Sequence, residues 1–161
     1  MPNQVPLNIG SVPYPQYSFV RTDVIKISVA ITKGNIYTLD AEGRLIVPVS
    51  TSSVADLTKG AFQALADVTA PAAEDTDKVQ GMIGGSYIVL KAPANLVVGQ
   101  EVELGSSSST TDQDKCKASA SPRTKGFLGR IKEIYTKGTD GAIKQKTADD
   151  DLVIIELEGV A

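Results

Sequence analysis

The tripeptide Thr-Lys-Gly occurs twice in the chain, in similar surroundings. It reads TKGAF at 58–62 and TKGFL at 124–128, so an aromatic residue follows closely in both copies. Further residues match in the same order at nearly constant spacing: Gly34 with Gly99, Asn35 with Gln100, Leu39 with Leu104, Leu65 with Ile131, and YIV at 87–89 with VII at 153–155. Self-similarity of this kind predicts an internal duplication, with copies over about 26–90 and 91–159. One domain with accidental similarity remains the alternative, because short β-units resemble one another.

The pattern inside each copy is that of short β-strands. In VIKISVAI, residues 24–31, apolar side chains alternate with others, as in a half-buried strand. Asp140-Gly141 is a typical hairpin turn, and Pro48 places its segment at the edge or end of a sheet. AFQALADV fits a strand or a short helix, and the best helix candidate is SVADLTKGAF, capped by Ser52 or Ser53. The expected fold is mainly β: two small barrel- or sandwich-like units with little helix.

The chain therefore divides into an N-terminal arm at 1–22, a first β-unit at 23–90 and a second β-unit at 91–161. The arm holds four prolines, and no charged side chain precedes Arg21. Proline restricts the backbone, so such a segment is extended and loses little entropy when it docks. Its apolar side chains favour burial, either on the second unit or on another molecule. We favour another molecule, because an extended segment can add to an exposed sheet edge.

Two gaps in the composition exclude much of enzyme chemistry. The chain has no histidine, which removes His-based acid–base catalysis and His metal sites, and one cysteine, Cys116, which forms no internal disulfide. Lysines flank Cys116 and could lower its pKa, but an unpaired structural thiol is the simpler interpretation. The glycine-rich GMIGG at 81–85 lacks both the P-loop and the dinucleotide spacing. We expect no enzyme, no catalytic residue, no cofactor and no metal.

Charge is unevenly distributed along the chain. Residues 115–146 hold nine basic and two acidic side chains, whereas the rest of the chain holds seven basic and seventeen acidic ones. The basic segment lacks the interleaved aromatic residues of a single-strand binder, and the whole chain carries a net charge of −3, so nucleic acid is an unlikely partner. Complementarity to an acidic protein surface, or between subunits, fits this pattern better, with simple solvation as the alternative.

Several of these features together resemble the head decoration, or cement, proteins of tailed bacteriophages. The resemblance lies in KGNIYTLDAEGRL at 33–45, in the strand LIV at 45–47, in GMIGGSYIVL at 81–90 and in the proline-rich arm. It implies a non-enzymatic virion protein, made in the host cytoplasm without a signal peptide, that binds the outer capsid surface. Its partner would be the major capsid protein, and its oligomer would be a trimer. The small core of each unit also favours an oligomer.

The expected interface combines the apolar arm with the basic segment. Its residues are Val5, Leu7, Ile9, Tyr14, Tyr17, Phe19, Lys125, Arg130 and Lys132. Two other classes of function remain open. One is a different virion or cell-surface structural module, such as a head fibre base, a tail domain or an adhesin-like domain. The other is a β-domain that binds a small ligand or a carbohydrate, although the absence of tryptophan counts against stacking on sugars.

Overall fold

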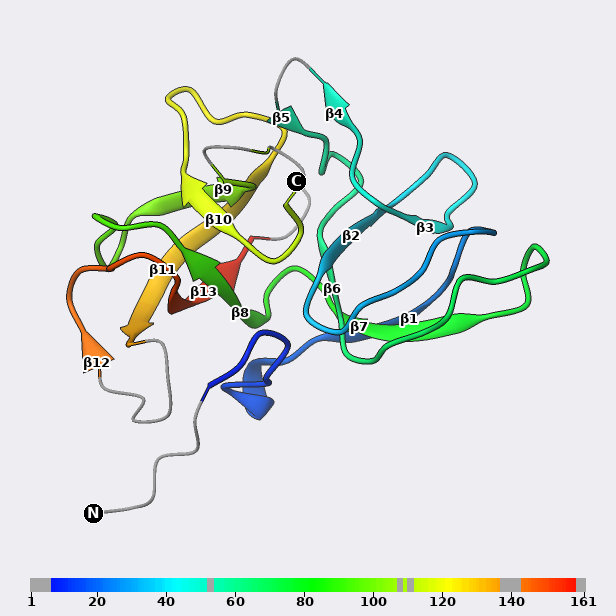
Figure 1. Cartoon of the computed structure of the whole chain (residues 1–161), viewed down its shortest axis with the longest axis horizontal. Helices are drawn as coiled ribbons and strands as arrows, with labels where there is room; N and C mark the ends of the chain where they lie inside the picture. The colour runs from blue at the N-terminus through cyan, green and yellow to red at the C-terminus, as the bar shows by residue number, and fades with distance from the viewer. Residues whose placement is uncertain (1–6, 52–53, 107–108, 110–111, 137–142, 159–161) are drawn as a thin grey trace.

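The computed structural model describes residues 7–51, 54–106, 109, 112–136 and 143–158, and it is almost entirely β. Figure 1 shows two compact β-units side by side, with the N-terminal segment below them. The elements of the first part are a 3₁₀ turn η1 (Pro15–Tyr17) and the strands β1 (Val20–Val24), β2 (Ile36–Leu39), β3 (Leu45–Ile46), β4 (Ser50–Thr51), β5 (Val54–Ala55), β6 (Phe62–Ala64) and β7 (Lys78–Met82). Those of the second part are β8 (Tyr87–Ala92), β9 (Glu101–Leu104), β10 (Cys116–Ala118), β11 (Phe127–Tyr135), β12 (Ile143–Lys144) and β13 (Asp151–Leu157).

The two units have the same strand order. The first sheet runs β1-β7-β6-β2-β3, and the second runs β8-β13-β11-β9-β10, with β12 paired to β11 outside this path. If the strands of each sheet are numbered in chain order, both sheets have the spatial order first, fifth, fourth, second, third. Every pair of neighbouring strands within these sheets is antiparallel. This confirms the prediction of a mainly β fold built from two units.

The register of the strands is also repeated. One row across the first sheet joins Val20, Met82, Gln63 and Ile36. The row at the same place in the second sheet joins Tyr87, Glu156, Arg130 and Glu101. The following hairpins agree as well, with Leu39 opposite Leu45 in one unit and Leu104 opposite Cys116 in the other. A shared order and a shared register are what a duplicated unit requires.

The tight turns before the second strand of each unit share their backbone conformation and an equivalent hydrogen bond. Gly34 and Gly99 have φ of 89° and 88°, a left-handed conformation that favours glycine. The Gly34 amide donates to the Ala64 carbonyl at 2.8 Å, and the Gly99 amide donates to the Ile131 carbonyl at the same distance. The predicted match of Gly34 with Gly99 is thus confirmed. Ile131, however, matches Ala64 and not Leu65, because β11 has a bulge between Phe127 and Gly129.

Each sheet closes on itself through a parallel bridge between its first and third strands. Ile25 bridges to Leu45 in the first unit, and Lys91 bridges to Lys115 in the second. The largest buried cluster then joins the two units, since Ile36, Leu57 and Met82 of the first pack with β8, β9, β11 and β13 of the second. Gln63 reinforces this junction, because its side-chain amide donates to the Gly34 carbonyl at 3.0 Å and to the Val89 carbonyl at 2.9 Å.

Three local expectations differ from the structure. The strand β8 pairs with β13, so the change from one sheet to the other lies between Met82 and Tyr87 and not at residue 90. For the same reason YIV at 87–89, in β8, corresponds to β1 of the first unit. It pairs with β13, the strand that contains VII at 153–155, and is therefore not the copy of that segment. No helix forms in the described part of SVADLTKGAF, residues 54–62: β5 pairs with β4 there, and Phe62 begins β6.

The arm is shorter than expected and lies on its own chain. The first strand begins at Val20, within the range predicted as arm. Leu7, Ile9 and Tyr14 pack against a cluster on the outer face of the second sheet, formed by Val89, Leu152 and Ile154. The preferred prediction of an intermolecular partner for these side chains was therefore wrong. Apolar residues on the outer face of β8 and β13 need a cover, and the arm supplies it within the same molecule. The predicted hairpin residues Asp140 and Gly141 lie outside the described residues.

Candidate interaction surface

The end of the N-terminal segment presents an aromatic patch, defined here as Tyr17, Phe19 and Val20. About half of each side chain is exposed: 52%, 54% and 48%, respectively. The backbone beneath the patch is firmly held, since the Phe19 amide donates to the Ser86 hydroxyl at 2.8 Å and the Phe19 carbonyl accepts from the Ile83 amide at 2.9 Å. The patch is therefore an ordered apolar surface fixed to the connection between the two units.

A charged row lies on the second sheet and consists of Glu101, Arg123, Arg130, Glu156 and Glu158. Arg130 and Arg123 both bind the Glu101 carboxylate, the former at 2.8 Å, and Arg123 also contacts Glu158 at 3.3 Å. The hydrogen bond from Arg123 and the two positive charges hold the pKa of Glu101 below its ordinary value. The Arg123 guanidinium also stacks 3.9 Å from the centroid of the Phe127 ring. The row is thus a preorganised set of charges.

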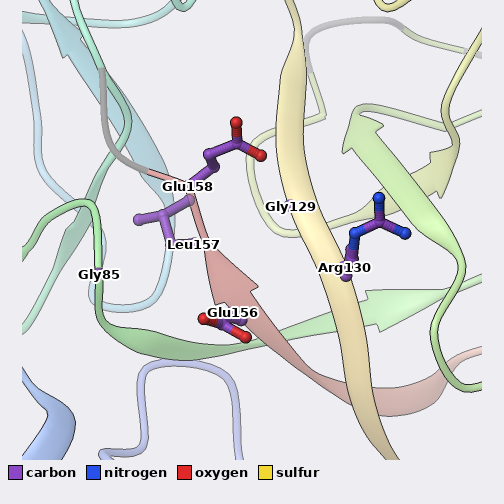
Figure 2. A pocket seen from close by; sticks show the side chains of 6 residues that line it. All are labelled: Gly85, Gly129, Arg130, Glu156, Leu157 and Glu158. Carbon is purple, nitrogen blue, oxygen red and sulfur yellow. The ribbon is translucent and has the colours of Figure 1, made fainter. Parts of the chain in front are cut away.

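A groove of about 410 Å³ joins the patch to the row. Gly85, Gly129, Arg130, Glu156, Leu157 and Glu158 line it, and Figure 2 shows the side chains of Arg130, Glu156 and Glu158 around β11 and β13. A Cβ at Gly129 would lie 1.9 Å from the Glu156 carbonyl oxygen, so only glycine allows the two strands to approach this closely. Gly85 lies under the Phe19 ring, where an added Cβ would be 3.1 Å away.

The duplication explains why this surface is open. In the first unit the row of Met82, Gln63 and Ile36 is buried against the second unit. In the second unit the equivalent positions are Glu156, Arg130 and Glu101, which face solvent wholly or in part. The same face of the fold is apolar in the first unit, where the second unit covers it, and charged in the second unit, where the described residues leave it exposed. The charged row is hence available to another molecule.

The predicted interface residues fall into three groups. Leu7, Ile9 and Tyr14 are half-buried on their own second sheet, while Tyr17 and Phe19 form the aromatic patch. Arg130 belongs to the charged row, but Lys125 and Lys132 are exposed elsewhere, on the loop before β11 and within β11. Val5 lies outside the described residues. Sequence reasoning missed Glu101, Glu156 and Glu158, because only the strand register places Glu101 and Glu156 beside Arg130, and only the fold brings Glu158 to Arg123.

In the described part of the chain, three of the nine basic side chains in the predicted basic segment form ion pairs within the molecule. Arg123 and Arg130 pair with acidic residues of the same unit, and Lys144 binds the buried Asp151 at 2.6 Å. The excess of positive charge in the sequence is therefore balanced in part by acidic residues that the fold brings close. Cys116 is buried and unpaired, and burial raises the pKa of its thiol to about 12, so the flanking lysines do not activate it.

Among the residues that the structure describes, no three His, Cys, Asp or Glu side chains gather in a way that could hold a metal ion. Nor does this part of the chain contain a helix long and apolar enough to cross a membrane. Comparison with protein-family models finds no match, and comparison with curated proteins finds no similar sequence.

Proposed function

We propose that the protein is a capsid decoration protein, which binds the outer surface of a tailed-phage head and stabilises contacts between major capsid protein subunits. The observation that carries the proposal is the continuous surface formed by the aromatic patch, the groove and the charged row. Half-exposed aromatic residues and arginine beside a polar rim are the composition of protein–protein interfaces. This surface is held by two packed units rather than by mobile loops.

The physical requirements of such a role are modest. A pressurised shell fails where its subunits separate, so a protein that bridges a seam raises the work of separation. Each contact can be weak, because one rigid body that touches two neighbouring subunits gains effective concentration at the second site. The twin units supply a rigid body, since one buried cluster runs through both. The role needs no reaction chemistry.

The test is binding to heads purified from particles of the strain that encodes the chain, first stripped of the protein. The purified chain should sediment with these heads and raise their melting temperature. Phe19→Asp places a charge in the aromatic patch and should weaken binding about tenfold or more. Val49→Asp is the matched control, because Val49 is 59% exposed but lies away from this surface, between β3 and β4.

Antibodies against the chain decide between this function and its alternatives. Labelling over the whole head supports decoration, whereas labelling of tails or fibres would assign the protein to another virion module. Heads that bind neither the native chain nor the control variant would refute the proposal. Equal binding by Phe19→Asp and Val49→Asp would instead remove the aromatic patch from the interface.

A further inference from the structure

Glu156 differs from the other members of the charged row, because its carboxylate has no partner in the described part of the chain. Glu101 binds both Arg123 and Arg130, and Glu158 contacts Arg123 at 3.3 Å. Glu156 is exposed, and no ion pair or side-chain hydrogen bond joins it to another described residue. The row thus holds three carboxylates and two guanidinium groups, which leaves one negative charge in excess at Glu156.

Arg130 is the nearest candidate to balance this charge, but it is engaged elsewhere. It lies directly opposite Glu156 in the strand register. Its guanidinium, however, binds the Glu101 carboxylate at 2.8 Å and donates to the Gly99 carbonyl at 3.4 Å. Figure 2 shows the Arg130 side chain directed away from Glu156, on the other side of β11. The Glu156 side of the groove is therefore acidic.

Aromatic rings stand beside this unpaired carboxylate. Tyr87 lies directly opposite Glu156 in the neighbouring strand β8, so the two side chains project from the same face of the sheet. The rings of Tyr14 and Tyr17 meet Tyr87 edge-on, with 5.1 Å and 5.7 Å between centroids. Together with Phe19 they are four of the chain's aromatic residues, which number five tyrosines and three phenylalanines. In a chain with so few aromatic residues, this concentration on one surface indicates binding.

The second unit already contains this combination of groups once. Arg123 contacts the Glu158 carboxylate, while its guanidinium lies 3.9 Å from the centroid of the Phe127 ring. Glu156 and the exposed Tyr17 likewise supply a carboxylate and an aromatic ring, but no guanidinium joins them among the described residues. The groove beside them, of about 410 Å³, has the usual size of a ligand site.

We propose that the groove beside Glu156 receives an arginine side chain of the partner protein. This inference rests on the proposed function and names the chemistry by which the partner is recognised. A planar guanidinium forms paired hydrogen bonds with a carboxylate in its own plane and stacks on an aromatic ring through its face. Aromatic faces carry partial negative charge and attract a cation. A lysine ammonium is a strongly hydrated point charge and gains less from the rings.

Titration with a single capped arginine tests the site without any capsid. Nα-acetyl-arginine methylamide should shift the backbone amide NMR signals of Gly85, Gly129 and Leu157, which line the groove. Because an exposed ion pair and one cation–π contact are both weak, we expect a dissociation constant of about 10 mM. The citrulline analogue has nearly the same shape without the charge, and it should bind at least about fivefold more weakly. Equal binding of the two compounds, or tighter binding of the lysine analogue, would overturn the proposal.

Two variants of the whole chain locate the bound cation. Glu156→Gln keeps the shape of the side chain and should weaken arginine binding about fivefold or more. Tyr17→Leu keeps an apolar side chain without the ring and should weaken it about twofold. Glu42→Gln is the matched control: Glu42 is exposed and has no ion pair among the described residues, but it lies in the turn between β2 and β3. Equal effects of Glu156→Gln and Glu42→Gln would refute the site.

Stripped heads then separate this inference from the proposed function. Glu156→Gln should weaken head binding about fivefold, and Glu42→Gln should leave it unchanged. If both variants bind heads as tightly as the native chain, arginine recognition at Glu156 is wrong and the decoration role stands. If the chain binds the arginine compound through Glu156 but does not bind heads, the site is supported and the capsid is excluded as its partner.

Discussion

The Tyr14 hydroxyl donates a hydrogen bond to the Glu133 carboxylate and so fastens the N-terminal segment to the second unit. Tyr135 donates to the other oxygen of the same carboxylate. The Tyr14 ring also stands edge-on to Tyr87, with 5.1 Å between the ring centroids. The Glu133 carboxylate on β11 thus accepts a hydrogen bond from both Tyr14 and Tyr135, and these three residues form the anchor of the arm. The apolar residues Leu7 and Ile9 pack beside this anchor.

Removing the Tyr14 hydroxyl should loosen the arm without unfolding the units. Tyr14→Phe keeps the ring contact with Tyr87 but loses a hydrogen bond to a charged group, which for a partly exposed pair costs about 1 kcal/mol. Chemical denaturation should show this loss, and hydrogen exchange should rise in residues 7–14 while β9 stays protected. Tyr17→Phe is the control, since Tyr17 is exposed. Equal effects of both variants would mean that Glu133 does not anchor the arm.

Alkaline pH should release the same anchor. Burial, followed by the hydrogen bond to Glu133, raises the pKa of Tyr135 from 10.0 to about 12, and the same causes raise the pKa of Tyr14. Because both values are higher in the folded state, their contribution to stability is complete below about pH 10 and is lost as pH rises through 12. Absorbance titration should show late-titrating phenol absorbance, which falls by one tyrosine in Tyr14→Phe and by one in Tyr135→Phe. Late phenol absorbance that neither variant reduces, in protein still folded, would contradict the anchor.

The repeated part of the fold could be predicted from the sequence because its signals are local. Gly34 and Gly99 share a turn that demands a left-handed residue, and the neighbouring Asn35 and Gln100 keep the same distance from it. The alternating apolar residues of 24–31, by contrast, were wrongly predicted as a strand: β1 ends at Val24, and a turn with Ser28 at a φ of 67° follows Lys26. The residues at which each copy begins could not be predicted from local signals. β1 and β8 belong to their sheets only because they pair with strands far along the chain.

The site was harder to predict because it depends on what the chain covers. Arg130 could be chosen from its position in a basic segment, but its pairing with Glu101 depends on the order of β9 and β11. The arm shows the same difficulty: its composition indicated burial, yet no pattern in residues 7–14 identifies the outer face of the second sheet as the partner. Apolar residues in a sequence indicate that a surface is buried. Only the tertiary structure shows which segment of the chain buries it.

The equivalent glycines Gly34 and Gly99 provide a direct measure of arm docking. Both have nearly the same positive φ, so alanine at either site costs about 1 kcal/mol of backbone strain. At Gly99 an added Cβ meets nothing within 4 Å, whereas at Gly34 it would lie 2.4 Å from Cγ2 of Ile9 and 3.0 Å from its carbonyl carbon. Gly34→Ala should therefore be the more destabilising variant by about 1–2 kcal/mol, and it should displace Ile9. Equal stabilities of the two variants would show that the arm is not packed on this turn.

Deletion of residues 2–17 should weaken the second unit more than the first. The deletion uncovers Val89, Leu152 and Ile154 on the outer face of β8 and β13 and removes the partly buried side chains of Leu7, Ile9 and Tyr14. With partial burial taken into account, the loss is about 3 kcal/mol or more. The strands themselves do not include residues 2–17, so circular dichroism should still show a β fold with a lower melting temperature, and dye binding to exposed apolar surface should increase. A truncated protein as stable as the full chain would show that the arm does not cover this face.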